Sequence, residues 1–121
     1  MLKLAAALGL ALFVAFGDAA TQEPGCLHGP SEAPAQALRR QAAVGFARLV
    51  NTTELRAHQQ AQTYYALSDL HTIPPAPEGF KAQLSTDGVS YTFSVKDTLD
   101  SCGFAFFSDQ DGMIYTATPI R

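Results

Sequence analysis

The sequence predicts an α+β fold in which one long N-terminal helix packs on a four-stranded antiparallel meander sheet. Apolar residues recur at three- and four-residue spacing between Ser31 and Leu67, as on one face of an amphipathic helix. Further along, apolar and polar residues alternate over Phe80–Val95 and Gly103–Thr118, as in half-buried strands. Because the helical pattern precedes all the strand patterns, we expect an antiparallel sheet with the helix on one face.

The helix is expected to begin near Ser31, a residue type that caps first turns, with Pro34 inside the first turn. Asn51 lies three residues before Glu54, a spacing that resembles a capping box, so a break or kink is expected there. Gly45 is a second weak point, because glycine lowers helix propensity. The residues of the periodic face are Leu38, Ala42, Phe46, Leu49, Thr53, Ala57, Tyr64 and Leu67.

Glycine, proline and aspartate mark the connections between these elements. Ile73–Gly79 contains three prolines and is expected to be a loop, because proline has no backbone N–H to donate. Asp87 and Gly88 form the dipeptide that tight hairpins prefer, since both residue types tolerate positive φ. Asp111 and Gly112 are expected to form the turn between the last two strands.

The last of these turns has one chemical alternative. Asp109, Asp111 and Gly112 resemble the start of an EF-hand calcium loop. Such a loop needs a glutamate at its twelfth position, which Ile120 occupies here. A structural turn is therefore favoured over a metal site.

The start of the chain has the pattern of a secretory signal peptide. Lys3 is followed by an unbroken apolar run, Leu4–Phe16, and then by small residues. We expect residues 1–19 to be removed by cleavage after Ala19 or Ala20, which would place the mature protein in the periplasm or outside the cell. An uncleaved anchor is the alternative, although the run is shorter than the roughly 20 residues that a membrane span needs.

The remainder is expected to comprise a flexible segment, residues 20–30, and one folded domain, residues 31–121. The net charge of −3 lacks the basic excess of nucleic-acid-binding domains, so no nucleic-acid partner is expected. Four arginines fall within the helical segment, and we expect them to form a solvated face. They are Arg39, Arg40, Arg48 and Arg56.

Cys26 and Cys102 are the two cysteines of the chain. In an exported protein they can form a disulfide, provided that their Cα atoms come within about 7 Å. The sequence alone leaves open whether they pair. Cys26 and His28 fall short of the four ligands of a typical zinc site, and His28 is expected to be solvent-exposed in its Pro/Gly-rich loop.

The sequence offers no convergent set of residues for nucleophilic or acid–base catalysis. We therefore expect a protein that is not an enzyme and that uses no cofactor or metal. The aromatic residues of the strands are expected to lie mostly in the core, while a minority could form an exposed contact strip. They are Tyr91, Phe93, Phe104, Phe106, Phe107 and Tyr115.

Two stretches resemble bacterial type IV pilin-like proteins. In one branch of that family, Leu-Arg-Thr-Ile-Asn-Thr-Ala-Glu occupies the second half of the long N-terminal helix, and Ala47–Glu54 is similar to it. The closing stretch Phe106–Ile114 is similar to the Phe-Ser-Asp-Gln-x-Gly-(Val/Met)-Ile ending of the same branch. The resemblance implies that residues 31–121 form a pilin-like head, related to a pilus or a secretion pseudopilus.

The start of the chain departs from that family. Type IV prepilins carry a short basic leader, then Gly-Phe-Thr-Leu-Ile-Glu, then an apolar helix that stays in the filament core. Here the hexapeptide is missing, and the apolar run ends in a signal-peptidase-like site. We therefore expect a head domain without its assembly helix.

The resemblance implies a function through protein–protein interaction with a pilus, pseudopilus or envelope component. The expected contacts are Leu38, Phe46 and Leu49 on the helix, and the sheet edge Tyr115–Ile120, where unpaired backbone groups permit strand addition. The alternative is a cystatin-like secreted inhibitor or a small-ligand-binding domain. An inhibitory hairpin would carry Gln-x-Val-x-Gly, which Gln83–Gly88 does not match.

Overall fold

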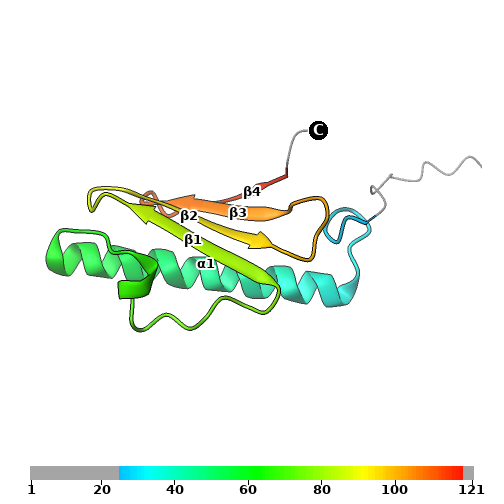
Figure 1. Ribbon diagram of the computed structural model, residues 1–121, viewed down its shortest axis with the longest axis horizontal. Coiled ribbons are helices and arrows are strands. Elements are labelled where there is room, and N and C mark those ends of the chain that lie inside the picture. The colour runs from blue at the N-terminus through cyan, green and yellow to red at the C-terminus, as the bar shows by residue number, and fades with distance from the viewer. Residues whose placement is uncertain (1–24, 119–121) are drawn as a thin grey trace, which may run out of the picture.

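The computed structural model describes residues 25–118, in which one helix packs on one face of a four-stranded antiparallel sheet (Figure 1). This confirms the predicted α+β class. The expected signal peptide and Ile120 lie outside the described residues. In chain order, the elements are α1 (Pro34–Ala61), the short 3-10 helix η1 (Leu67–Asp69), β1 (Phe80–Thr86), β2 (Tyr91–Asp97), β3 (Ala105–Asp109) and β4 (Ile114–Ala117).

The helix is an internal element of the chain, and both of its predicted ends are wrong. Ala33, not Ser31, occupies the N-cap position, and Pro34 begins the helix, where the missing N–H leaves no hydrogen bond unmade. At the other end, Ala61 is the last helical residue. Gln62 then adopts a left-handed conformation with φ 61°, and its N–H closes the last turn, a common way for helices to end.

The break expected near Asn51 does not occur, and α1 also continues through Gly45. The Asn51 side chain does not cap a backbone N–H. Instead it is buried and hydrogen-bonded to the side chains of Tyr91 and Ser108 on the sheet. The apparent capping box therefore serves tertiary packing, which overrides the local signal.

The strands follow one another as a meander, so each pairs antiparallel with the next along the chain. In the β1–β2 turn, the Asp87 carboxylate accepts two backbone N–H groups of its own turn, and Gly88 has φ 88°. In the β3–β4 turn, the Asp109 carboxylate accepts the Asp111 N–H at 3.0 Å, and Gly112 has φ 75°. These carboxylates therefore close the turns, as aspartate often does.

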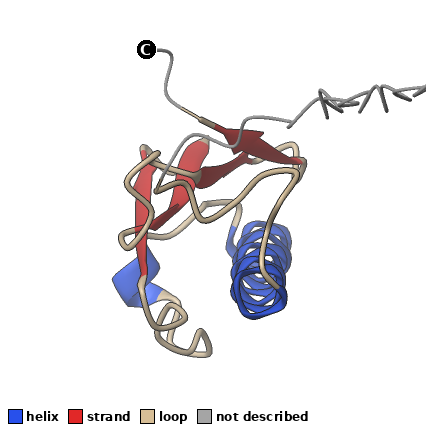
Figure 2. Cartoon of the chain, turned by 90° about the vertical axis from the view of Figure 1, so that its right-hand side faces the viewer, coloured by secondary structure: helices blue, strands red, loops and turns tan. Residues whose placement is uncertain are grey.

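The core lies between α1 and the sheet (Figure 2). Phe46 is buried there, with its ring centroid 6.1 Å from that of Phe93. It is therefore not available as the surface contact that the sequence suggested. The buried apolar residues of this core are Ala43, Phe46, Ala47, Val50, Leu70, Phe80, Tyr91, Phe93, Val95, Phe104 and Phe106. Across residues 25–118, no helix combines the length and the apolar character that a membrane crossing requires.

A disulfide joins Cys26 to Cys102, as the sequence allowed. Their Cα atoms lie 5.1 Å apart across a sequence separation of 76 residues. The bridge is possible because the N-terminal end of α1 lies beside the β2–β3 connection, so the loop before the helix reaches the residues before β3 (Figure 1).

Replacing both bridge residues, Cys26→Ala with Cys102→Ala, is expected to lower the free energy of unfolding by about 2–5 kcal/mol, because the unfolded chain regains the freedom of a long loop. Urea unfolding followed by circular dichroism measures this change. The wild-type protein with its disulfide reduced is the matched control and is expected to show a similar loss. Equal stability of the oxidised protein and the double variant would contradict the expectation.

Candidate functional site

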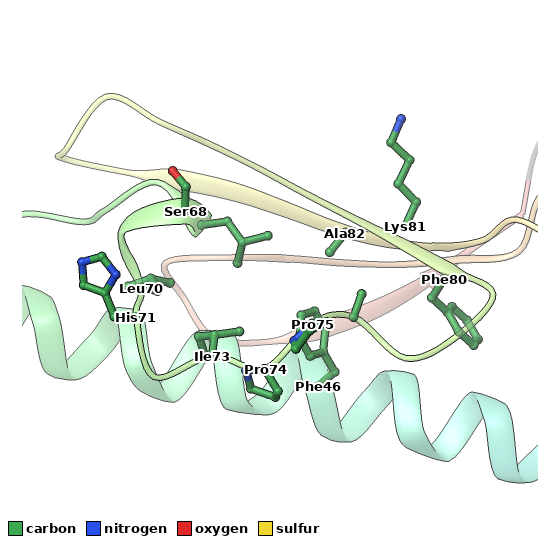
Figure 3. A pocket seen from close by; sticks show the side chains of 12 residues that line it. Phe46, Ser68, Leu70, His71, Ile73, Pro74, Pro75, Phe80, Lys81 and Ala82 are labelled. Carbon is green, nitrogen blue, oxygen red and sulfur yellow. The ribbon is translucent and has the colours of Figure 1, made fainter.

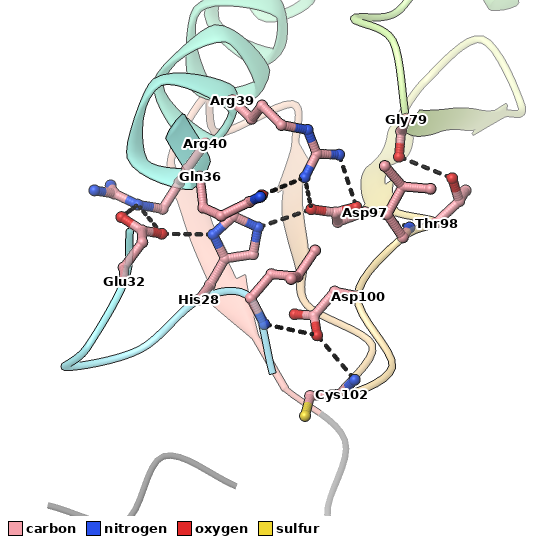
Figure 4. A network of polar contacts seen from close by, with 12 residues as sticks. His28, Glu32, Gln36, Arg39, Arg40, Gly79, Asp97, Thr98, Asp100 and Cys102 are labelled. Atoms are coloured by element: carbon pink, nitrogen blue, oxygen red, sulfur yellow. Dashed lines mark hydrogen bonds and ion pairs between the residues drawn. The ribbon is translucent and has the colours of Figure 1, made fainter. Parts of the chain in front are cut away.

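A buried network of ionisable groups lies where the N-terminal loop, α1 and the end of β2 meet (Figure 4). The side chain of His28 is only 2% exposed, so the expectation of a solvent-exposed histidine is wrong. Its Nε2 lies 2.8 Å from Asp97 Oδ2, and its Nδ1 lies 2.5 Å from Glu32 Oε2. When both carboxyl groups are ionised, His28 can make both bonds as a donor only in its protonated form.

Two arginines of α1 complete the network. Arg39 donates two hydrogen bonds of 2.9 Å to the two oxygens of Asp97, and Arg40 Nε donates to Glu32 at 3.0 and 3.1 Å. The paired geometry of guanidinium and carboxylate gives strong, oriented contacts. The sequence suggested that all four arginines form a solvated face. Arg39 and Arg40 are instead ion-paired, with side chains 23% and 38% exposed, whereas Arg48 and Arg56 are exposed as expected.

The charges of this network change the acidity of its carboxyl groups. Burial alone would raise the pKa of Asp97, but hydrogen bonds from Arg39 and His28 outweigh it and hold the pKa below its ordinary value. For Glu32, burial alone would likewise raise the pKa, but hydrogen bonds from His28 and Arg40 outweigh it and lower the pKa below its ordinary value. Both carboxylates thus stay ionised at neutral pH. The ion pair between His28 and Asp97 holds the N-terminal loop against the end of β2.

The disulfide lies beside this network, together with Asp100. One Asp100 oxygen accepts the N–H groups of Leu27 (3.2 Å) and Cys102 (2.9 Å). Within residues 25–118, Cys26, Asp100 and Cys102 are the one group close enough to share a metal ion. Their sulfur atoms are bonded to each other, so they offer no thiolate to a metal. The disulfide and Asp100 therefore join the loop before α1 to the residues that precede β3.

A second polar cluster joins α1 to the other end of the sheet. Asn51 Nδ2 donates to Ser108 Oγ at 2.6 Å, and Asn51 Oδ1 accepts the Tyr91 hydroxyl at 2.8 Å. The Ser108 hydroxyl in turn donates to the Met113 carbonyl at 2.8 Å. Burial, with the charge of Glu54 as a smaller cause, raises the pKa of Tyr91 above its ordinary value, so its hydroxyl stays a donor.

Glu54 is fully buried on the same side of α1. Its Oε2 accepts the Tyr65 N–H at 3.0 Å, whereas its Oε1 has no hydrogen-bond partner in the described part of the chain. Burial raises the pKa of Glu54, and the single backbone hydrogen bond only partly offsets that rise.

An apolar pocket of about 680 Å³ lies between α1, β1 and the segment that follows η1 (Figure 3). Its polar lining residues do not converge on the space, and Lys81 points away from it (Figure 3). The apolar side chains that line it include Phe46, Leu67, Leu70, Ile73, Phe80 and Ala82. The pocket is large enough for a small molecule, and its chemistry favours an uncharged one.

The face of α1 that points away from the sheet carries a run of apolar and small residues in its N-terminal half. Leu38, Ala42, Gly45 and Leu49 follow one another at intervals of four, three and four residues, and all four are exposed. Leu38 is 67% exposed and Leu49 40%. A Cβ atom added at Gly45 would meet nothing within 4 Å, so packing within the described chain does not require a glycine there.

The exposed face of α1 is also positively charged. Arg48 and Arg56 are exposed and make no ion pair within residues 25–118. The one acidic residue of α1 is Glu54, which is buried on the opposite side. Leu38, Ala42, Gly45, Arg48, Leu49 and Arg56 are called the outer helix face below.

Of the residues proposed from the sequence as interaction contacts, Phe46 is buried and Ile120 lies outside the described residues, and the other three lie in two places. Leu38 and Leu49 lie on the outer helix face, whereas Tyr115 is exposed on the outer side of β4. Sequence reasoning missed the His28 network, because its members are far apart in the chain. Only the four-residue spacing of His28 and Glu32 hinted at it.

Comparison of the chain with protein-family models, with curated proteins and with solved structures found no match in any of the three.

The Asp97→Asn variant is expected to lower the free energy of unfolding at pH 7 by about 3 kcal/mol, because it leaves Arg39 and His28 with a neutral partner. The pKa of Asp97 is lowered in the folded state. Its contribution to the free energy of unfolding is therefore present above about pH 4 and is lost as the pH falls further. Urea unfolding between pH 2 and 7 should thus show the two proteins converging in acid. The exposed Asp69→Asn is the matched control, and a similar small effect of both variants would contradict the role of Asp97.

The Glu54→Gln variant is expected to be as stable as the wild type or more stable at pH 8, by on the order of 1 kcal/mol. Burial raises the pKa of Glu54 in the folded state. The contribution of Glu54 to the free energy of unfolding is therefore complete below about pH 4.5 and is lost as the pH rises through the folded pKa. The advantage of the variant should therefore grow with pH. Unfolding curves at pH 5 and pH 8 measure this, with the exposed Glu78→Gln as control; an advantage that shrinks with pH would refute it.

Proposed function

We propose that this chain is an exported, non-enzymatic pilin-like domain that acts by binding another protein, through its outer helix face, in a pilus- or pseudopilus-related assembly of the cell envelope. The observation that carries the proposal is the run of exposed apolar and small residues on α1, Leu38 to Leu49, beside arginines without ion pairs. Spacing of four, three and four residues is the spacing with which one helix packs against another.

The fold supports the likeness to pilin-like heads. One helix lies on one face of a four-stranded meander, as the periodicity of the sequence predicted, and a pilin-like head would have this arrangement. The two stretches that carry the resemblance also contact each other, because Asn51 of α1 is hydrogen-bonded to Ser108 of β3. This contact between the two stretches supports the proposal.

The groups best suited to chemistry support a non-enzymatic role. His28 is buried between two carboxylates, and Cys26 and Cys102 are bonded to each other. A general base must reach its substrate, and a cysteine nucleophile must be a thiolate. Both conditions fail for these residues in the folded, oxidised chain.

The charge of the outer helix face favours a particular kind of partner. With Arg48 and Arg56 free of ion pairs and no carboxylate exposed on α1, a helix with apolar and acidic residues would complement it. Gly45 lets such a helix approach the backbone of α1 closely.

A photo-crosslinking residue at Leu49, in the full chain expressed in its source cells, is expected to yield a discrete adduct. The crosslinked protein should have a prepilin-type apolar helix when identified by mass spectrometry. The same residue at Thr92, exposed on the outer side of the sheet, is the control. Adding Gly45→Glu should weaken the adduct at Leu49 about tenfold or more, since it blocks close approach and places a charge in the contact.

Equal adducts at Leu49 and Thr92, or none at Leu49, would refute the proposal. The apolar pocket beside Leu70 and Ile73 is the observation that would then favour the second candidate, a small-ligand-binding domain. Saturable binding of an uncharged apolar dye would support that candidate.

A further inference from the structure

The side of the sheet that faces away from α1 has two chemically different halves. Over β3 and β4 it is aromatic: Phe107 and Tyr115 are cross-strand neighbours, 46% and 53% exposed, and Met113 beside them is 58% exposed. Phe107 and Tyr115 are called the aromatic pair below. Over β1 and β2, the outward positions are polar, namely Lys81, Gln83, Ser85, Thr92, Ser94 and Lys96.

The aromatic pair lies at an open edge of the sheet. β4 pairs only with β3 among the described strands, so one side of its backbone has no strand partner in the described chain. Natural edge strands are usually protected by being very short, or by charge, proline or a bulge, and β4 is short, with four residues. Ile114–Ala117 has neither charge nor proline, whereas β1, the opposite edge, carries Lys81.

We propose that β4 pairs antiparallel with β4 of a second copy of this chain, joining the two sheets across a two-fold axis. The inference does not depend on the helix-binding partner proposed above. It rests on the exposed aromatic pair and on the uncharged edge strand next to it, which has no second strand partner in the described chain.

The alternation of side chains restricts how two copies of β4 can pair. Facing residues of an antiparallel pair point to the same side of the sheet. About a two-fold axis, Tyr115 must therefore face either itself or a residue an even number of positions away. With Tyr115 facing Tyr115 of the second copy, the side chains of Phe107, Tyr115 and their counterparts form one continuous aromatic row across both sheets.

Two further features favour a second copy as the occupant. The chain has a net charge of −3, yet Ile114–Ala117 is uncharged, so two copies of this edge do not repel each other directly. The aromatic row also stays continuous only if the added strand presents an aromatic residue in register with Tyr115, which β4 itself does. Because the strand is only four residues long, we expect a weak dimer, with a dissociation constant on the order of micromolar.

Sedimentation equilibrium of the mature, oxidised chain over a range of about 1 to 300 μM tests the proposal. The wild type is expected to approach dimer as its concentration rises. Tyr115→Lys and Tyr115→Glu should each weaken the dimer at least tenfold, because each puts like charges face to face. A mixture of the two variants should form a heterodimer, because the opposite charges then meet. Thr92→Lys, on the outer side of β2, is the control and should dimerise like the wild type.

Circular dichroism establishes that each variant is folded before its association is measured. A wild type that stays monomeric at the highest concentration would overturn the proposal, as would folded Tyr115→Lys that still dimerises. Failure of the mixture to restore dimers would overturn the Tyr115-to-Tyr115 register. Gly45→Glu lies on the outer helix face and should leave dimerisation unchanged, so this result and the crosslinking result can fail separately.

Discussion

The carboxylate of Asp97, buried at the end of β2, joins this strand to the N-terminal loop and to α1, which lie some 60 to 70 positions earlier in the sequence. It accepts hydrogen bonds from Arg39 of α1, from His28 of the N-terminal loop and from the Leu99 N–H. A buried charge without partners would be strongly unfavourable, so β2 can end there only if α1 and the loop lie beside it. The disulfide of Cys26 holds the same loop covalently, a few residues away.

A second anchor fixes the other half of the helix. Asn51 uses both its donor and its acceptor on the sheet, through Ser108 and Tyr91. Between the two anchors, the contacts are apolar, with Phe46 packed against Phe93. Apolar burial supplies most of the driving force for packing but has little directional preference, whereas satisfied buried polar groups select one alignment. The position of α1 along the sheet therefore depends on its two polar anchors.

The sequence patterns predicted the elements well where a local period was sufficient. Alternating residues identified the four strands, and turn residues such as Asp87 and Gly112 separated them. The predicted start of the helix was wrong because Pro34, not the residue directly after Ser31, begins it. The predicted end was wrong because Gln62, in a left-handed conformation, ends α1 before the apolar period does. The Asn51 spacing predicted a break, since a local pattern does not reveal that a side chain is used across the core.

The candidate sites were less predictable than the fold. His28 and Arg39 appeared to be ordinary surface residues, because their partner Asp97 lies some 60 to 70 positions along the chain. Leu38 and Leu49 share the helical period with Phe46, and only the packing of α1 on the sheet separates exposed from buried positions. Tyr115 could be proposed at an edge because the last strand of a meander has only one neighbour.

Each buried anchor uses residues on the inner side of α1 or of the sheet, and this has a consequence for the two proposed surfaces. The helix α1 lies on one side of the sheet (Figure 2), and the aromatic pair is exposed on the other side, so occupying the outer helix face leaves the aromatic pair free. A two-fold axis perpendicular to the joined sheet would place both copies of α1 on the same side. A partner with repeated helices, such as a filament, could then bind both helices of a dimer, and the second contact would form at a raised effective concentration. Weak dimerisation through β4 would in this way strengthen binding of the partner to the outer helix face, although β4 itself does not touch that partner.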